Sequence, residues 1–583
     1  MKKILLIDDS FQLSESHIKN ISELLIIPYT DDVKFLQNLF QELQNLKINY
    51  QVTYPSSRYA SLYRSHADSL TKYLQQQTLR SFNDSKITER FFGNKWGQIG
   101  VYSITYELNP IHNKILTHFL LFQLVQDLKK EYEIDSFEIV SVDQDLLSLF
   151  GKGHSSSLRD FFVGIYQQIK NIFFFFIHKY YANKYQIKFR WKKSKKLFVI
   201  YLPFYRKSNG KLKSSYLLDK QDELDVDFCY LGMFADISIQ KIKETYADFF
   251  AYENGKCFSS VPAQISSMTY LKIWLGSLWA YLVLFLTFRP LLRFEGANFG
   301  NFFRSTILKS FSSGKIVDCL SLIEVMQECT VDEVRYLFEN YGWERALNYS
   351  LKTFHSKTKT VALQNYAFGP KSTNFYFPWN AESQYIPDEL WVLGDYFKNL
   401  LLEFHWPEEL LKFTSSYRYR ALIESVLDRQ ERKSDQKKMA VLFNVNKSEN
   451  LLLYNTYKNI FKKKSWEIIF REHPVYPSFN FLGSEANNLK FQNGGSLYEF
   501  LAGVDFVLCG FGGVGLEAFV LGKKVILPLS NKQLNLATVT AELSKEVLEV
   551  SMEDVLKGNL AFDDNLNQNY PADYFFIDLV KKG

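Results

Sequence analysis

Short apolar runs alternate with amphipathic stretches in the first quarter of the chain. An apolar run at 3–7 is followed by a helical pattern at 33–46 and by a second apolar run at 49–53. A long helical pattern at 113–132 then leads into the apolar run 136–142. Strands that alternate with helices are typical of βαβ units, so this pattern predicts an α/β fold with a parallel sheet.

The same alternation returns near the end of the chain, after the charged run 430–438, which we interpret as a solvated linker. Beyond this run the pattern predicts strands at 439–444, 467–470, 489–491, 505–509 and 525–527, with helices between them. Such an order of elements is that of a compact Rossmann-like domain.

A chain of 583 residues is too long for one hydrophobic core, so two large domains are expected. We place an N-terminal Rossmann-like domain at 1–375, with a mostly helical insertion at 239–350. A helical linker at 376–438, the C-terminal Rossmann-like domain at 439–545 and a helical tail at 546–583 complete the expected organisation.

The most specific signal in the C-terminal domain is a strand, glycine loop, helix and strand within 505–528. The loop contains four glycines, which are Gly510, Gly512, Gly513 and Gly515. Glycine permits close backbone approach, and the free N–H groups of a helix N-terminus favour an anion such as a phosphate. Glu517, expected on the first helical turn, is a candidate acceptor of hydrogen bonds from sugar hydroxyls. The alternative is a purely structural turn, because such turns also serve tight strand–helix packing.

Polar side chains also end the strand upstream, where Arg471, Glu472 and His473 reach its carboxyl end. Ligands bind at these ends in parallel α/β sheets. Histidine titrates near neutrality, so His473 suits donation to a phosphate oxygen or protonation of a leaving group. Alternatively, His473 is a strand-end residue fixed by the following Pro474, and Arg471 pairs with a neighbouring glutamate instead of a phosphate.

Composition narrows the classes of function. The chain has 69 basic and 63 acidic residues, an excess too small to indicate nucleic-acid binding. Its five cysteines show no CxxC spacing, so neither a zinc site nor a disulfide framework is expected, and a reducing cytoplasm is the simplest setting. The N-terminal apolar run ends at Asp8 and Asp9, which favours a first strand over a signal peptide.

Aromatic residues make up 17% of the chain, and two apolar runs raise the question of membrane contact. The run 273–288 has sixteen uncharged residues, fewer than the roughly 20 that a spanning helix needs. We therefore expect a buried or interfacial helix there and keep a membrane span as the alternative. The run 172–177 is a second candidate for interfacial contact, with a buried segment as its alternative.

Two Rossmann-like halves, the second with a nucleotide loop, describe a GT-B fold: two Rossmann-like domains facing a cleft, here with an added helical middle region. The strand-His-Pro and glycine-loop patterns resemble those of bacterial surface-polysaccharide glycosyltransferases, including capsule Kdo transferases and polysialyltransferases. In that family the His-Pro motif and the loop engage the CMP of the donor. The resemblance carries this role onto His473, Pro474, Gly512, Gly513 and Glu517.

This resemblance implies transfer of a CMP-activated ulosonic acid, Kdo-like or sialic-acid-like, during synthesis of capsule, O-antigen or lipooligosaccharide. The acceptor is a glycan or a lipid-linked glycan, which places the protein in the cytoplasm or at the inner face of the cytoplasmic membrane. No metal and no cofactor beyond the donor substrate are expected, because helix N-termini and cationic side chains neutralise the leaving nucleotide.

A second resemblance concerns the segments 336–347 and 361–372, which are similar to the "ENxxWE … GxQH" region of surface-carbohydrate synthesis proteins. In those proteins the glutamates line the interdomain cleft. The chain departs from the pattern at Gln364-Asn365-Tyr366, where a histidine is expected, so no acid or base role for a histidine follows there.

Glycosyl transfer needs a base for the acceptor hydroxyl or, in a covalent route, a carboxylate nucleophile. Glu339 and Glu344 are candidates, although on an expected helix they lie about 140° apart and at most one faces the donor. The alternative for Glu344 is a buried ion pair with Arg345 or Arg335. Asp9, at the end of the first strand, is a third candidate, with helix capping as its alternative.

Three other functions remain open from the sequence. One is a transferase that uses a UDP- or GDP-hexose, and another is a CDP-polyol phosphotransferase, since both use related phosphate-binding positions. The third is a non-catalytic scaffold of a polysaccharide assembly complex, which the missing Gln-His pair favours.

Overall fold

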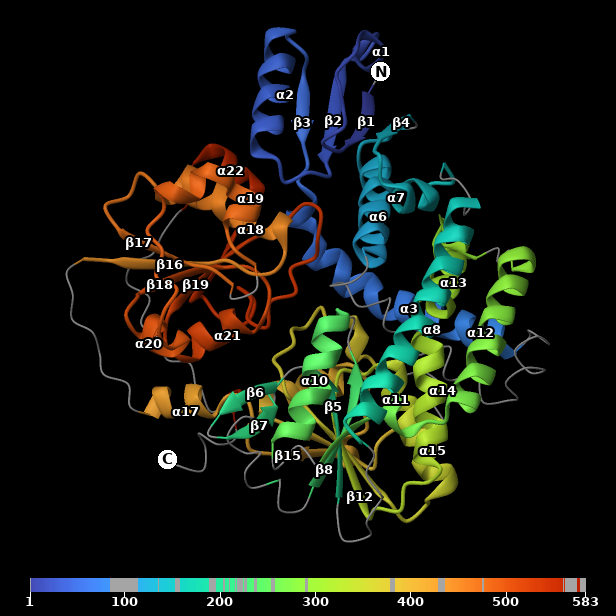
Figure 1. The fold of residues 1–583 in the computed structure, drawn as a ribbon. Coiled ribbons are helices and arrows are strands. Elements are labelled where there is room, and N and C mark those ends of the chain that lie inside the picture. Colours follow the sequence, from blue (N-terminus) through green and yellow to red (C-terminus); the bar gives the residue numbers. More distant parts are fainter. Residues whose placement is uncertain are drawn as a thin grey trace.

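The computed structural model describes residues 2–558, 560 and 574–576, apart from gaps. The gaps are 84–113, 135, 153–157, 188–195, 203–204, 209, 215–216, 218–223, 225–227, 235–237, 253–256, 289–291, 378–382, 428–435 and 474–475. Within the described residues, three separate parallel sheets are joined by a layer of long helices (Figure 1).

The C-terminal part forms a five-stranded parallel sheet. Its order is β17 (Glu467–Arg471), β16 (Lys438–Leu442), β18 (Phe506–Cys509), β19 (Lys524–Pro528) and β20 (Val547–Val550). Figure 1 shows helices on both faces, which are α18 (Lys447–Thr456), α19 (Phe479–Leu482) and α22 (Met552–Lys557) on one and α20 (Leu497–Ala502) and α21 (Gly513–Val520) on the other. The chain passes from β16 to β17 and then returns to β18 on the other side of β16, so the topological switch point lies between β16 and β18.

A seven-stranded parallel sheet forms the second Rossmann-like unit. Its order is β15 (Leu411–Phe413), β14 (Glu389–Val392), β13 (Lys359–Leu363), β12 (Glu333–Leu337), β5 (Lys196–Leu202), β8 (Phe228–Phe234) and β9 (Phe258–Ser260). Further helices of this part of the chain are α10 (Ile239–Ala251), α11 (Val261–Gln264), α15 (Gly342–Phe354), α16 (Asp395–Glu403) and α17 (Arg420–Leu427). Its strands are buried on both faces, as in other parallel sheets.

The N-terminal residues form a third, smaller parallel sheet of order β3 (Tyr50–Val52), β2 (Glu23–Pro28), β1 (Lys2–Ile7) and β4 (Phe137–Val140). Helices α1 (Glu15–Ile18), α2 (Val33–Asn45) and α7 (Gln144–Leu149) belong to this part of the chain. The expected strands at 3–7, 49–53 and 136–142 are confirmed, and β2 is a strand that the sequence analysis did not identify.

Long helices connect the sheets on the right of Figure 1. They are α3 (Pro55–Asn83), α6 (Ile115–Glu131), α8 (Leu158–Lys184), α12 (Ser267–Thr287), α13 (Gly300–Ser312) and α14 (Lys315–Met326). Two short antiparallel hairpins, β6 (Tyr205–Ser208) with β7 (Lys211–Ser214) and β10 (Arg293–Phe294) with β11 (Ala297–Asn298), complete the described elements. One described helix, α12, is long and apolar enough to cross a membrane by length and composition alone.

The two larger sheets face a common cavity with their carboxyl ends, which is the GT-B arrangement and confirms the expected fold class. The expected domain bounds need correction. The segment 1–375 does not form one Rossmann-like domain, because β1 to β4 make a sheet of their own. The expected insertion 239–350 contains β9 and β12, and the expected linker 376–438 contains β14 and β15.

The C-terminal bounds also differ from the expectation. The expected tail 546–583 contributes β20 and α22 to the C-terminal sheet unit, and the expected strand 489–491 is only an isolated bridge between Phe491 and Phe470. Each of these strands has at most five residues, and a short buried strand has no periodicity that separates it from a helical segment. The short strands β9, β12, β14, β15 and β20 therefore explain the errors in the insertion, linker and tail, whereas the separate N-terminal sheet is a matter of strand pairing.

The N-terminal part of the chain is tied to the C-terminal unit by specific polar contacts. Asp31 of the N-terminal unit accepts hydrogen bonds from Ser530 Oγ (2.5 Å) and from the backbone N–H of Asn531 (2.7 Å), in the loop after β19. The hydroxyl of Tyr59 donates to the carbonyl oxygen of Asn531 at 2.7 Å. These bonds fix the loop after β19, which also forms part of the cavity wall described below.

The chain end returns to the seven-stranded unit. The ring of Phe575 lies 4.8 Å from that of Tyr396, and the ring of Phe576 lies 5.1 Å from that of Tyr419. Gly394 is needed for this contact, because a Cβ there would lie 2.4 Å from the carbonyl oxygen of Phe575. The ring of Phe575 also lies 6.0 Å from that of Phe519 on α21, so the chain end contacts both Rossmann-like units.

Candidate functional site

A cavity of about 440 Å³ lies between the carboxyl ends of the two larger sheets. This volume falls within the range of about 300–1,000 Å³ that is common for small-molecule sites. The seven-stranded unit lines it with Glu339, Tyr341, Tyr366, Ala367, Phe368, Ser372, Asn374, Phe375, Arg418 and Tyr419. The C-terminal unit lines it with Asn444, Val445, Asn446, Glu449, Phe511, Gly512, Gly513, Gln533 and Leu536.

The cavity wall that the C-terminal unit forms lies at the topological switch point of its sheet. Loops after β16 and β18 diverge there, and open α/β sheets bind ligands at this place. Two helices begin at the cavity: Asn446 is the N-cap of α18, and Gly512 is the N-cap of α21. Helix N-termini carry partial positive charge, so both favour an anion in the cavity.

Two glycines of the glycine loop are required for different reasons, one for its backbone conformation and one for space. Gly512 has φ of +130°, a conformation that side chains rarely adopt, and it gives α21 no side-chain cap. Gly510 is needed for space instead, because a Cβ there would lie 1.7 Å from Oε1 of Glu449. A ligand anion is therefore the natural partner for the first N–H groups of α21.

The carboxyl group of Glu449, on the first turn of α18, lies against Gly510, in space that a side chain at Gly510 would occupy. Its side chain is buried, and it accepts hydrogen bonds from the backbone N–H of Phe511 and from Asn444 Nδ2 (2.5 Å). Burial raises the pKa of Glu449 to about 7, although these hydrogen bonds favour the charged form. A carboxyl of this pKa holds or releases a proton near neutral pH, so Glu449 is suited to acid–base chemistry.

Arg418 supplies the cationic side chain of the cavity. It follows the loop after β15 and is half-buried, with its guanidinium 5.7 Å from the ring centre of Tyr419. Tyr419 is fully buried, and its hydroxyl accepts a hydrogen bond from the backbone N–H of Ala367 at 3.1 Å. Arg418, from the seven-stranded unit, and the two helix N-termini, from the C-terminal unit, bring positive charge to the cavity, as a phosphate requires.

The seven-stranded unit also presents Glu339 to the cavity, two residues after the end of β12. The expectation that Glu339 and Glu344 share a helix is wrong, since α15 begins only at Gly342. Glu344 lies on the first turn of α15 and accepts hydrogen bonds from the backbone N–H groups of Glu339 (2.9 Å) and Tyr341 (3.0 Å). Glu344 therefore positions the loop that carries Glu339 and does not itself line the cavity.

A buried network supports the same loop. Asn340 has a φ of +61° and donates to the carbonyl oxygens of Asn374 (2.7 Å) and Tyr376 (3.1 Å). Arg345 donates to Asn340 Oδ1 and to the carbonyl oxygen of Tyr385 (3.2 Å). The segment recognised from the sequence as "ENxxWE" thus consists mainly of residues that hold Glu339 in place.

Burial raises the pKa of Glu344 to about 8, and this predicts a pH-dependent stability. A carboxyl whose pKa is higher in the folded state contributes stability that is present below its unfolded pKa, near 4.5, and is lost as pH rises toward 8. We expect Glu344→Gln to lessen the fall in melting temperature between pH 5 and pH 8 by several degrees. Thermal melts at both pH values test this expectation.

Glu333→Gln is the control for this prediction, because Glu333 lies on β12 and pairs with Arg335 at 2.5 Å. An equal pH dependence in wild type and Glu344→Gln would contradict the assignment of the burial effect to Glu344.

The remaining expected site residues that the structure describes lie outside the cavity lining. The guanidinium of Arg471 donates to the carbonyl oxygen of Gly495 (2.8 Å) and lies 5.1 Å from the ring centre of Phe500. His473 follows β17, one strand away from the switch point, and burial lowers its pKa. Pro474 is outside the described residues. The structure therefore separates Arg471 and His473 from the glycine loop's cavity.

Glu517 and Asp9 also have surroundings that differ from the expectation. Glu517 lies on the second turn of α21 and is buried beneath Gly513, where burial raises its pKa and Arg418 opposes the rise. Asp9 caps no described helix; it accepts a hydrogen bond from Thr30 Oγ1 and pairs with Lys532 at 2.6 Å. Asp9 thus fastens the N-terminal unit to the loop after β19.

Four residues that line the cavity were not expected from the sequence: Arg418, Glu449, Asn444 and Asn446. A signal for the last three is present, since Asn444 ends the expected strand 439–444, Asn446 lies two residues beyond it and Glu449 lies on the helix that follows. Polar residues at a strand end before a helix are the pattern that identified the glycine loop. Arg418 carries no comparable signal, because its loop reaches the cavity only through the packing of the two units.

No protein-family model matches the chain, and comparison with curated proteins returns no match. Among solved structures, the chain is similar to a UDP-GlcNAc 2-epimerase from Neisseria meningitidis bound to UDP-GlcNAc (13% identity; 62% of this chain and 90% of that chain; TM-score 0.34). It is also similar to CalG4, the calicheamicin glycosyltransferase (11% identity; 63% and 88%; TM-score 0.35), and to the wall teichoic acid polymerase TagF (12% identity; 64% and 80%; TM-score 0.28). These scores are low, so the fold rests on the chain's own sheet topology.

Proposed function

We propose that this chain is a glycosyltransferase that binds a nucleotide sugar in the cavity between its two Rossmann-like units. One observation carries the proposal: the glycine loop, two helix N-termini and Arg418 converge on a cavity that also contains a proton-holding carboxyl. The glycine loop, the helix N-termini and Arg418 favour binding of a nucleotide phosphate. The carboxyl can give a proton to that phosphate as it leaves the sugar.

In the proposed reaction, the bond between the anomeric carbon of the donor sugar and a phosphate oxygen breaks, and a bond to the acceptor oxygen forms. Glu449 gives its proton to the leaving phosphate, next to the N–H groups of the glycine loop. Glu339, from the seven-stranded unit, takes the proton of the acceptor hydroxyl. Arg418 and the helix N-termini neutralise the charge that develops on the leaving nucleotide.

For the donor we propose a CMP-activated ulosonic acid, transferred to a surface glycan or a lipid-linked glycan. The support for CMP comes only from the sequence pattern around His473. The cavity adds no support for CMP through this residue, because His473 does not line it. A UDP- or GDP-hexose donor and a CDP-polyol donor place the same phosphate requirement on the cavity. The nucleotide that binds therefore decides among these donors.

Calorimetric titration of the full chain with CMP, CDP, UDP and GDP tests the proposal. We expect CMP to bind more tightly than UDP and GDP. Selectivity for UDP or GDP would move the assignment to hexosyl transfer, and selectivity for CDP would move it to polyol phosphate transfer. No binding of any nucleotide would overturn the proposal and favour the non-catalytic scaffold.

His473→Ala belongs in the same titration, because it separates two places for the nucleotide. A nucleotide held only by the cavity keeps its affinity in His473→Ala. Loss of CMP binding in this variant would instead show that the end of β17 contributes to the donor site, as the sequence resemblance implies.

A further inference from the structure

Helix α8 is apolar on two opposite faces. Its inner face is packed: Phe175 stacks on Tyr270 with ring centres 3.5 Å apart, and Gln168 and His178 are buried. The outer face is exposed and carries Phe162, Val163, Tyr166, Ile169, Phe173, Phe176 and Tyr180. Most of these residues are three or four positions apart, so they form one stripe along the helix.

Helix α12 extends this apolar stripe into a broader surface. The two helices touch closely at Gly164, where a Cβ would lie 2.0 Å from the hydroxyl oxygen of Tyr281. Trp274 Nε1 also donates to the carbonyl oxygen of Gln168 at 2.9 Å. The outer side of α12 exposes Met268, Leu275, Trp279 and Leu286. Only 28% of the most apolar 18-residue stretch of this helix is buried.

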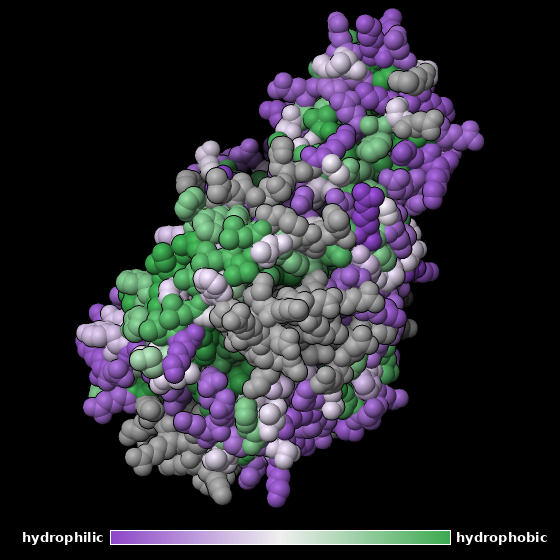
Figure 2. Space-filling model, turned by 90° about the vertical axis from the view of Figure 1, so that its right-hand side faces the viewer, coloured by the Kyte–Doolittle hydropathy of each residue, from purple (hydrophilic) through white to green (hydrophobic). Residues whose placement is uncertain are grey.

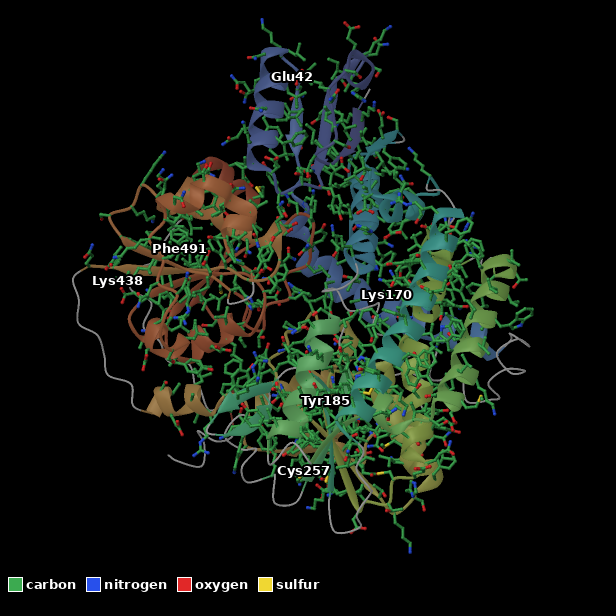
Figure 3. The ribbon with its side chains drawn as sticks, viewed as in Figure 1. Glu42, Lys170, Tyr185, Cys257, Lys438 and Phe491 are labelled. Carbon is green, nitrogen blue, oxygen red and sulfur yellow. The ribbon has the colours of Figure 1, made fainter. Side chains whose placement is uncertain are left out.

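We name the exposed apolar residues of α8 and α12 the α8–α12 surface. Figure 2 shows a broad hydrophobic area on the side of the molecule where these helices lie. Figure 3 shows Lys170, which belongs to α8, to the right of Lys438 and Phe491 of the C-terminal unit. Soluble monomers rarely expose apolar areas of this kind unless a partner covers them.

The charges of the two helices indicate which partner covers the surface. Together they carry five basic residues and one acidic residue, the basic ones being Arg159, Lys170, Lys179, Lys184 and Lys272. The whole chain, by contrast, has 69 basic and 63 acidic residues, so the imbalance is local. Lysines next to exposed aromatic side chains are typical of helices that bind anionic membranes.

A second copy of the chain suits this surface less well. Lysine is depleted in protein–protein interfaces, whereas here lysines lie on the same two helices as the apolar residues. Tyr166, Tyr180 and Trp279 have rings with a polar atom, and such rings are enriched where acyl chains meet headgroups.

We propose that the α8–α12 surface binds the face of an anionic lipid bilayer, with its aromatic residues in the headgroup and acyl boundary. This inference stands apart from the proposed glycosyl transfer, because it uses none of the cavity residues. It also gives a structural account of the run 172–177, which belongs to α8, and of the run 273–288, which belongs to α12 and its C-cap Phe288.

Flotation of the full chain with vesicles tests this inference. We expect binding to vesicles that mix phosphatidylglycerol with phosphatidylcholine, weak binding to phosphatidylcholine alone, and release by high salt. Phe173→Glu and Leu286→Glu each bring a charge into the bilayer boundary and are expected to weaken binding at least about tenfold. Lys184→Gln and Lys272→Gln are each expected to weaken it about fivefold.

Leu46→Glu is the matched control, because Leu46 is an exposed leucine at the end of α2, away from the α8–α12 surface. It is expected to bind vesicles as the wild type does, and circular dichroism confirms that each variant is folded. Binding that is unchanged in Phe173→Glu and Leu286→Glu would overturn the proposal. So would retention through carbonate extraction, which indicates a span, or a dimer that Leu286→Glu dissociates without any vesicle binding.

Discussion

Glu449→Gln is expected to lower the rate of nucleotide release from the donor about 100-fold, with little change in donor affinity. The amide has nearly the shape of the carboxyl and can still accept the N–H of Phe511, but it has no proton to give. General acid catalysis by a side chain contributes about 10²–10⁴ in rate, which sets the size of the expected loss.

The pH profile of this reaction carries the same prediction. Burial raises the pKa of Glu449 to about 7, and a general acid acts while it is protonated. The rate of the wild type is therefore expected to fall as pH rises through about 7, and this fall is expected to be absent in Glu449→Gln. Steady-state release of the nucleotide between pH 5 and pH 9 measures both effects.

Glu546→Gln is the control for Glu449→Gln. Glu546 is also a buried carboxyl of the C-terminal unit whose pKa is raised by burial, but it does not line the cavity. A fall in rate near pH 7 that persists in Glu449→Gln and disappears in Glu546→Gln would remove Glu449 from the proposed reaction.

Arg418→Ala is expected to weaken nucleotide binding about 10- to 100-fold. A hydrogen bond from a cationic side chain to a phosphate contributes roughly 1.5–3 kcal/mol to the binding free energy. The partial positive charge at the N-termini of α18 and α21 replaces only part of the charge that the substitution removes. Affinity measured by calorimetry for the nucleotide that binds the wild type tests this expectation.

Arg420→Ala provides the comparison, since Arg420 is exposed, pairs with Glu424 at 3.1 Å and lies two residues beyond Arg418. It is expected to bind the nucleotide as the wild type does. Unchanged affinity in Arg418→Ala would instead place the phosphate elsewhere, and Arg471 and His473 at the end of β17 would be the next residues to test.

The apolar α8–α12 surface lies on helices that contribute no residue to the cavity lining. The exposed stripe of α8 explains part of the high aromatic content, because residues such as Phe173 and Tyr180 lie outside any core. Aromatic rings of the seven-stranded unit explain another part: Phe338 packs against Trp406 and against Phe375, which lines the cavity.

Local patterns in the sequence determined the parallel α/β class, most strands of the C-terminal unit and the glycine loop. These features depend on neighbouring residues: apolar runs form buried strands, and Gly512 permits a turn that other residues rarely adopt. The resemblance of the segment 336–347 to known surface-carbohydrate proteins implied that Glu339 lies next to a cleft, although it did not show that Glu344 only positions its loop.

Tertiary structure alone decided the rest. Arg418 and Glu449 are 31 residues apart in sequence and lie on different Rossmann-like units, so only the packing of these units brings them to one cavity. The raised pKa of Glu449 arises from burial beneath Gly510, and the exposure of Phe173 depends on which side of α8 the neighbouring helices cover. Burial is a property of the assembled chain, because it depends on contacts between segments that are distant in sequence.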